Sequence, residues 1–136
     1  MKISTGISEL DKVLKGGLEW NRIYLIVGSP GSGKSVFSFN FLNEGVENGE
    51  NVGYVCVNKN STIAIEEYSS LFPDSIDKIG KNIFFIEPTP FFARILANHE
   101  YEIAFRSFFD DLVSEIKKLE LRRVAIDPFS FLLSQE

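Results

Sequence analysis

Residues 28–35, Gly28-Ser29-Pro30-Gly31-Ser32-Gly33-Lys34-Ser35, form the stretch that decides the fold of this chain. The stretch satisfies the pattern G-x-x-x-x-G-K-[S/T], the loop that wraps around nucleotide phosphates. The apolar run 23–27 before it predicts a buried strand, and the apolar spacing over 35–46 after it predicts a helix. A strand, a glycine-rich loop and a helix in this order define the phosphate-loop motif. The sequence therefore predicts an α/β fold with a nucleotide bound at this loop.

The residue types in this loop suit a bound triphosphate. The start of a helix offers unpaired backbone N–H groups and a partial positive charge to an anion. Glycine lets the main chain approach the phosphates because it has no Cβ. We expect Lys34 to bind the β- and γ-phosphates and the Ser35 hydroxyl to bind Mg²⁺. The residues expected to hold the nucleotide are Gly28, Ser29, Pro30, Gly31, Ser32, Gly33, Lys34 and Ser35. The alternative is a glycine-rich turn in which the lysine occurs by chance.

A carboxylate at the end of the last apolar run is the candidate for the metal side of this site. Residues 122–127 predict a strand that ends at Asp127. In phosphate-loop proteins an acid at this position holds Mg²⁺ through a water molecule, opposite the serine of the loop. We therefore expect Ser35 and Asp127 to form the metal side of the site. The alternative for Asp127 is a turn-forming aspartate before Pro128.

The length and composition predict one globular nucleotide-binding domain over residues 1–136. Hydrophobic residues make up 44% of the chain and charged residues 24%, which is ordinary for a globular protein. No apolar run approaches the roughly 20 residues that span a bilayer, and residues 1–6 lack the apolar part of a signal peptide. We therefore expect a cytoplasmic protein without a membrane segment. The net charge of −5 disfavours a nucleic-acid partner.

Alternating helical and strand patterns predict a three-layer α/β sandwich with a mostly parallel sheet. Helices are predicted over 7–15, 35–46, 61–72 and about 100–119, and strands over 23–27, 52–57, 83–86 and 122–127. Residues 91–98 carry no clear pattern. We expect Cys56 to be a buried, inert thiol. The arginines Arg94, Arg122 and Arg123 are expected in solvent, with phosphate contacts across a subunit boundary as the alternative.

The residues around the loop resemble a known family. Residues 5–17 fit T-G-I-x-x-L-D-x-x-L-x-G-G, and this pattern before a phosphate loop resembles the RecA/RadA superfamily of P-loop ATPases. Residues 41–50 fit F-L-x-E-G-x-x-x-G-E and run into an apolar strand, as in the KaiC branch. The resemblance is close over residues 4 to 61 and resumes at 122–127. It implies a RecA-like core that binds ATP and Mg²⁺ and works as a homo-oligomeric ring, commonly a hexamer, with ATP between neighbouring subunits.

Two departures from the family pattern bear on activity. KaiC-like ATPases carry a pair of glutamates after the second strand, whereas this chain has Asn58 and Lys59 there. An amide cannot take the proton of the attacking water, and losing a general base costs about 10²–10⁴ in rate. The alternative is that Glu66 or Glu67 serves as the base. The second departure is length, because the family domain continues beyond the acid that matches Asp127. In the family sheet, one of the missing strands lies between the strand that matches residues 23–27 and the strand that ends at Asp127. We therefore expect the chain to be part of a longer protein, or its sheet to be completed by another chain.

These observations favour an ATP-binding KaiC-like regulatory module with weak or no hydrolysis, acting through ATP occupancy and subunit association, with a protein partner as a further option. One alternative is an active RecA-superfamily ATPase working in a homo-oligomeric ring. A second alternative is a DNA-handling protein of the recombinase type, which the acidic charge disfavours. A small-molecule kinase shares the phosphate loop but not the pattern of residues 5–17.

Overall fold

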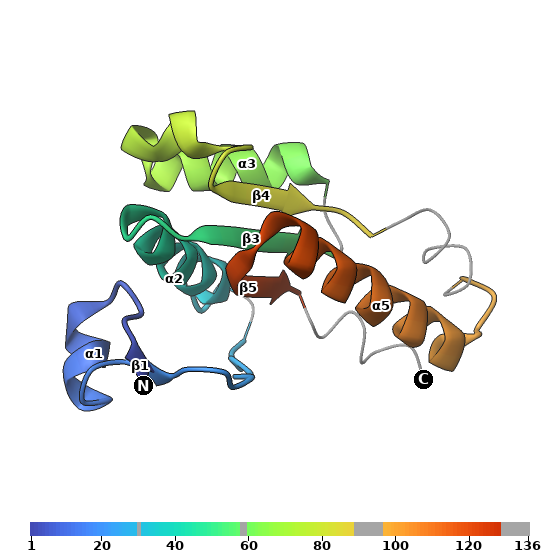
Figure 1. The fold of residues 1–136 in the computed structure, drawn as a ribbon, viewed down its shortest axis with the longest axis horizontal. Coiled ribbons are helices and arrows are strands. Elements are labelled where there is room, and N and C mark those ends of the chain that lie inside the picture. Colours follow the sequence, from blue (N-terminus) through green and yellow to red (C-terminus); the bar gives the residue numbers. More distant parts are fainter. Residues whose placement is uncertain (30, 58–59, 89–96, 129–136) are drawn as a thin grey trace.

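The computed structural model describes residues 1–29, 31–57, 60–88 and 97–128. Its central element is a parallel sheet of β4 (Ile83–Ile86), β3 (Asn51–Cys56) and β5 (Leu121–Asp127), in the order β4-β3-β5 (Figure 1). Val52 pairs with Ile83 on one side and Arg123 on the other. A register shift at Asn51/Val52 sets Arg122 outside this pairing. The carboxyl ends of the three strands therefore meet at one edge of the sheet.

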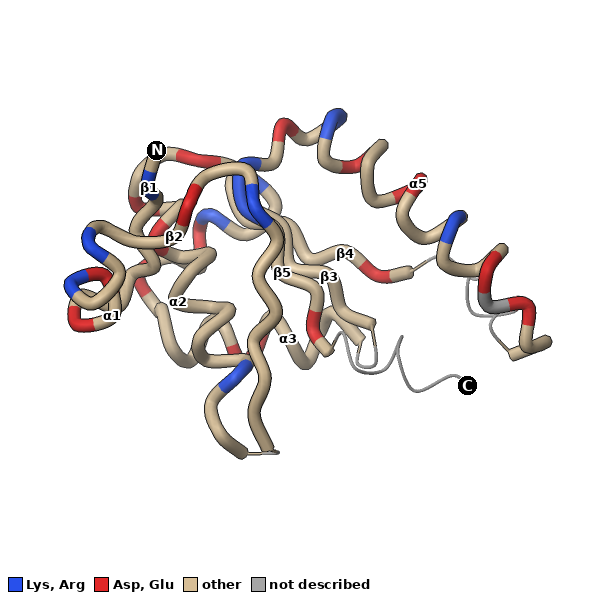
Figure 2. The backbone as a smooth tube through the Cα atoms, turned by 90° about the horizontal axis from the view of Figure 1, so that it is seen from below, with Lys and Arg blue, Asp and Glu red and all other residues tan. Residues whose placement is uncertain are grey.

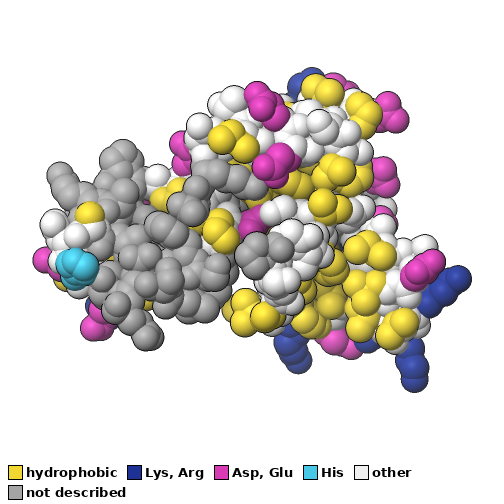
Figure 3. All heavy atoms as spheres, turned by 180° about the vertical axis from the view of Figure 1, so that it is seen from behind, with side chains coloured by type: hydrophobic (Ala, Val, Ile, Leu, Met, Phe, Trp, Pro, Cys, Tyr) yellow, Lys and Arg dark blue, Asp and Glu magenta, His cyan; other side chains and the backbone are white. Residues whose placement is uncertain are grey.

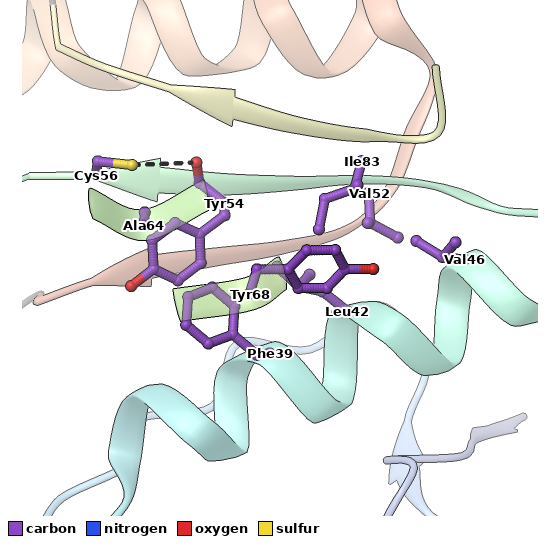
Figure 4. Packing of buried hydrophobic residues seen from close by; sticks show 9 residues of the cluster. All are labelled: Phe39, Leu42, Val46, Val52, Tyr54, Cys56, Ala64, Tyr68 and Ile83. Atoms are coloured by element: carbon purple, nitrogen blue, oxygen red, sulfur yellow. Dashed lines mark hydrogen bonds between the residues drawn. The ribbon is translucent and has the colours of Figure 1, made fainter. Parts of the chain in front are cut away.

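Helices cover both faces of this sheet, because side chains along each strand alternate between the faces. The helices α2 (Lys34–Glu47) and α3 (Ser61–Leu71) pack on one face, and α5 (Tyr101–Leu119) packs on the other. The first core contains the residues that Figure 4 labels: Phe39, Leu42, Val46, Val52, Tyr54, Cys56, Ala64, Tyr68 and Ile83. The second core contains Val55, Ala104, Phe108 and Leu112. The predicted three-layer α/β class with a parallel sheet is confirmed.

The helix ends follow their local sequence. The Asn60 side chain caps α3 by accepting a hydrogen bond from the Ile63 backbone N–H, at 3.0 Å. Pro73 lies just after α3 and begins the short 3₁₀ helix η1 (Pro73–Lys78). Within the described part of the chain, no helix is both long and apolar enough to cross a membrane.

The amino-terminal segment is held by the residues of the pattern over 5–17. It forms β1 (Lys2–Ile3), α1 (Ser8–Val13) and β2 (Leu18–Glu19), with β1 and β2 antiparallel. The buried Thr5 donates from its hydroxyl and its backbone N–H to Asp11, at 2.7 and 2.9 Å. Gly17 has a φ of +127°, and a Cβ there would lie 1.9 Å from the Ile3 carbonyl oxygen. These contacts explain the threonine, the aspartate and the last glycine of the pattern in structural terms.

The prediction of a buried strand at residues 23–27 is wrong. These residues belong to no strand, and Ile23 and Val27 are 101% and 83% exposed. Figure 1 shows the segment running below β5 in the same direction, and Figure 2 shows it without charged residues. Its ends lie at the two ends of β5, since Arg122 stacks on Trp20 at 5.3 Å and Ser35 contacts Asp127. Among the described residues no strand lies between this segment and β5, so its backbone has no partner that would make it a strand.

Exposed apolar side chains are the consequence of this missing pairing. Figure 3 shows hydrophobic side chains gathered at the surface on the face opposite to that of Figure 1. The exposed large hydrophobic residues of this segment are Ile23, Tyr24, Leu25, Ile26 and Val27. The apolar composition of this segment is therefore not matched by burial in the structure.

Candidate nucleotide-binding site

The candidate site lies at the carboxyl edge of the parallel sheet, where open α/β folds bind their ligands. Two elements meet there: the amino-terminal end of α2 and the end of β5. The loop 28–33 leads into α2, so the phosphate-loop residues and Asp127 come together although they are far apart in sequence.

The loop is curled, as a phosphate cradle requires. Gly31 and Gly33 have φ values of +81° and +94°, which glycine adopts without strain. A Cβ at either residue would meet nothing within 4 Å, so the space beside the loop is open. The Ser32 N–H donates to the Ser29 carbonyl oxygen at 3.1 Å and closes the turn. Pro30, also predicted to hold the nucleotide, lies outside the described residues.

Lys34 begins α2 and folds back over the loop. Its Nζ donates to the carbonyl oxygens of Gly28 and Ser29, the second at 3.2 Å. The helix is preceded by Gly33, so no side chain caps its first N–H groups, and its first turn contains no acid. An ammonium group and uncapped amides at a helix start are the groups that bind a phosphate anion.

Ser35 and Asp127 are in direct contact. The Ser35 hydroxyl donates to Oδ2 of Asp127 at 2.7 Å. The same oxygen accepts a hydrogen bond from the Tyr54 hydroxyl at 2.5 Å. The pair predicted to form the metal side of the site is therefore adjacent, and a tyrosine of β3 joins it.

Tyr54 was not foreseen as a site residue. Its side chain is fully buried, and its ring stacks on Phe39 with the centroids 4.7 Å apart (Figure 4). Burial, followed by the hydrogen bond to Asp127, raises the pKa of Tyr54, so its hydroxyl stays a proton donor. The signal in the sequence is a tyrosine in an otherwise apolar strand, near its carboxyl end, where a hydroxyl needs a partner.

The residues considered for proton abstraction are only partly described. Asn58 and Lys59 lie outside the described residues. Glu66 and Glu67 are exposed on α3, and the negative charge of Glu67 is one of the smaller contributions that raise the pKa of Tyr54. Glu87, which follows β4, accepts from the Ser61 N–H at the start of α3 at 2.6 Å. Sequence analysis missed Glu87, which lies at the same edge of the sheet as Asp127.

Arg123 is not in solvent, contrary to expectation. Only 4% of it is exposed, and its Nε donates to Glu50 at 2.9 Å. Its guanidinium also donates to the carbonyl oxygens of Ser4 and Phe41, at 2.6 and 3.0 Å. Arg123 thus ties the amino-terminal segment and α2 to β5. Arg122 is exposed as expected, and Arg94 lies outside the described residues.

The donor groups present fit a magnesium–triphosphate ligand. Mg²⁺ favours oxygen ligands and is usually held by one or two carboxylates together with substrate phosphates. Within the ranges that the structure describes, no group of three or more histidines, cysteines or acids is placed to hold a metal alone. A hydroxyl beside one carboxylate, next to a lysine and a curled loop, matches the set that serves Mg²⁺ only when phosphates complete it.

A parallel α/β sheet with this loop and this acid defines the class of RecA-like P-loop ATPase domains. The family model described as the KaiC ATPase matches residues 3–136, so the chain belongs to the KaiC ATPase family. A UPF0273 protein from Pyrococcus furiosus is 29% identical over 133 residues, which cover 93% of this chain and 53% of that protein. The circadian clock oscillator protein KaiC from Prochlorococcus marinus is 30% identical over 138 residues, covering 98% of this chain and 26% of that protein.

The similarity also extends to a recombination protein. The DNA repair and recombination protein RadB from Methanosphaera stadtmanae is 34% identical over 89 residues, covering 65% of this chain and 38% of that protein. The chain spans about half the length of the UPF0273 relative and about a quarter of the KaiC relative. The resemblance to the KaiC branch of the RecA/RadA superfamily is confirmed.

Proposed function

We propose that this chain is the ATP-binding part of a KaiC-type regulatory module that hydrolyses ATP slowly or not at all. The module responds to ATP occupancy and to association with further copies in a ring, rather than to turnover. Residues 1–136 act as one nucleotide-binding unit in this proposal. The single observation that carries it is the 2.7 Å contact between the Ser35 hydroxyl and the Asp127 carboxylate, beside a curled loop and its lysine.

Each group has a defined part in this binding. The backbone N–H groups of the loop residues other than Pro30 and the Lys34 ammonium bind the phosphates, since both carry positive charge and lie at the start of α2. Ser35 would hold Mg²⁺ directly and Asp127 would hold it through a water molecule. Bound Mg²⁺ neutralises part of the phosphate charge. Weak hydrolysis is supported by the sequence alone, because Asn58 and Lys59 stand where the family carries glutamates.

ATP binding is tested by titrating a fluorescent ATP analogue into the wild type, Lys34→Ala and Lys81→Ala. Lys81 is an exposed lysine far along the chain and serves as the matched control. Losing a charge-assisted contact predicts an affinity about ten- to a hundredfold lower in Lys34→Ala, with no change in Lys81→Ala. Equal affinity in the wild type and in Lys34→Ala refutes the proposal.

Slow hydrolysis is tested separately with Asn58→Glu. Phosphate release is expected to rise by about 10²–10⁴ if a missing base limits the rate. Turnover in the wild type that Asn58→Glu leaves unchanged refutes the hydrolysis part of the proposal while leaving ATP binding intact.

The second candidate function is an active ATPase working in a homo-oligomeric ring. It is favoured by the family, which is described as an ATPase. This candidate predicts ATP turnover in the wild type that disappears in Asp127→Asn and falls in Glu67→Gln. Light scattering with and without ATP measures whether copies associate.

A DNA-handling function is the third candidate, which rests on the similarity to the relative named RadB. The net charge of −5 disfavours it, because DNA binding depends on neutralising phosphates with cationic side chains. Affinity for single-stranded DNA that falls steeply with salt would support it.

A further inference from the structure

The Tyr54 hydroxyl lies where the metal side of the site is built. Tyr54 is on β3 and Asp127 is at the end of the neighbouring β5, and the two strands pair in parallel with Cys56 opposite Asp127. This register places the ring of Tyr54 beside the Asp127 carboxylate, and the Tyr54 hydroxyl donates to Oδ2 of Asp127 at 2.5 Å. The contact therefore follows from sheet pairing and not from a flexible side chain that happens to reach the site.

The ring of Tyr54 has little freedom to move. It stacks on Phe39 at 4.7 Å with the planes 23° apart, and it meets Phe85 at 5.8 Å. Its side chain is fully buried in the core between the sheet and α2 (Figure 4). A donor held this firmly fixes the position of its acceptor, which is how outer partners orient the groups that bind a metal.

Two hydroxyls meet on one carboxylate oxygen. Ser35 and Tyr54 both donate to Oδ2 of Asp127, at 2.7 and 2.5 Å. With Mg²⁺ bound, the Ser35 oxygen would serve as a ligand and would no longer be free to orient Asp127. The Tyr54 hydroxyl would then be the donor of this pair that still holds the carboxylate.

We propose that Tyr54 is a positioning residue that aims the Asp127 carboxylate at the water shell of Mg²⁺. The proposal rests on the magnesium–ATP binding proposed above. Tyr54 touches neither phosphate nor metal in this scheme, and it acts through Asp127 alone. It therefore governs the dependence of ATP binding on Mg²⁺ and not the affinity of the loop for phosphates.

The test compares Tyr54→Phe with the wild type and with Tyr68→Phe. Tyr68 is an equally buried tyrosine of the same core whose hydroxyl donates to Asn43 at 2.6 Å, away from Asp127, so its variant is the matched control. Affinity for the fluorescent ATP analogue is measured in EDTA and across a Mg²⁺ titration. Circular dichroism melting shows that each variant is folded.

The expected result is specific to the metal. In Tyr54→Phe the Mg²⁺ concentration at half-saturation rises about 10–100-fold, while affinity in EDTA stays at the wild-type value. Tyr68→Phe leaves both quantities unchanged. In an Asp127→Ala background, which removes the oxygen that accepts from Tyr54, Tyr54→Phe has no further effect.

Three outcomes overturn the inference. Equal Mg²⁺ half-saturation in Tyr54→Phe and the wild type does so directly, with the proposed function left standing. An equal loss in EDTA, or an effect that persists beside Asp127→Ala, shows that the hydroxyl acts through the fold. Absence of any Mg²⁺-dependent ATP binding in the wild type refutes the proposed function itself, and the inference with it.

A second measurement covers the case in which Tyr54→Phe does not fold. Incorporating 3-fluorotyrosine at position 54 keeps the ring and the hydroxyl but makes the hydroxyl a stronger donor. A shifted Mg²⁺ half-saturation with unchanged affinity in EDTA supports the inference, and an unshifted value overturns it.

Discussion

Replacing Arg123 by methionine is expected to destabilise the protein far more than the same replacement at Arg122. Arg123 is 4% exposed and pairs with Glu50, whose side chain is 26% exposed, at 2.9 Å. Methionine keeps the length of the side chain but leaves Glu50 and two backbone carbonyl oxygens without their donor. Breaking a buried ion pair in this way costs about 3–5 kcal/mol of unfolding free energy.

The neighbouring Arg122 provides a control on the same strand. It is exposed, and its described contact is the stacking on Trp20 at 5.3 Å. An exposed cation–π contact is worth about 0.5–1 kcal/mol, so Arg122→Met is expected to cost no more than that. Glu50→Gln keeps an acceptor while removing the negative charge, and its expected cost of about 1–3 kcal/mol lies between the two.

The assay is urea unfolding followed by far-ultraviolet circular dichroism, with the free energy obtained by linear extrapolation. Trp20 fluorescence is avoided because Arg122 contacts that ring. If Arg123→Met and Arg122→Met lower the free energy of unfolding by amounts within about 1 kcal/mol of each other, the buried contacts of Arg123 do not stabilise the fold as argued. If Arg123→Met does not fold, Glu50→Gln replaces it in the test. A loss of unfolding free energy in Glu50→Gln no larger than that in Arg122→Met would then refute the reasoning.

Three further predictions concern the pH dependence, the amino-terminal turn and the exposed apolar run. Burial raises the pKa of both Tyr54 and Tyr68. Above the unfolded tyrosine pKa of about 10, the folded protein therefore holds more protons than the unfolded chain, and the free energy of unfolding should fall as the pH rises further. Urea midpoints that stay constant from pH 9 to 11 would contradict this. Gly17→Ala should lower the melting temperature more than Gly80→Ala. A Cβ at Gly17 would lie 1.9 Å from a carbonyl oxygen, whereas Gly80 has a positive φ as well but open space beside it. Equal shifts would show that the clash is relieved without cost. The wild-type chain should bind a hydrophobic dye through the run before the phosphate loop, and Leu25→Lys should reduce the signal, because Leu25 is 63% exposed; unchanged dye fluorescence would locate the dye elsewhere.

Much of the fold follows from local pattern. The apolar runs over residues 52–57 and 122–127 predict two strands, and the structure has them at Asn51–Cys56 and Leu121–Asp127. The capping and stop residues around 60 and 73 set the ends of α3. Local spacing succeeds here because helix and strand periods are properties of neighbouring residues.

Local pattern fails where the outcome depends on a partner. Residues 23–27 have the composition of a core strand, yet the structure leaves them exposed, since a strand exists only where a neighbour supplies its hydrogen bonds. Arg122 and Arg123 are identical in type and adjacent in sequence. Because side chains alternate along β5, the two arginines face opposite sides, and only the tertiary structure decides that Arg123 is the buried one.

The sequence by itself determined that the chain belongs among phosphate-loop α/β proteins, because the motif 28–35 encodes a backbone shape as well as a chemistry. The sequence also predicts that Ser35 and Asp127, 92 positions apart, share one site, whereas tertiary structure alone decided that Tyr54 joins them. The physical reason is that parallel pairing of β3 with β5 brings the ends of distant segments to one edge of the sheet. Side-chain hydrogen bonds form between groups that are close in space, and distance along the chain does not specify which groups those are.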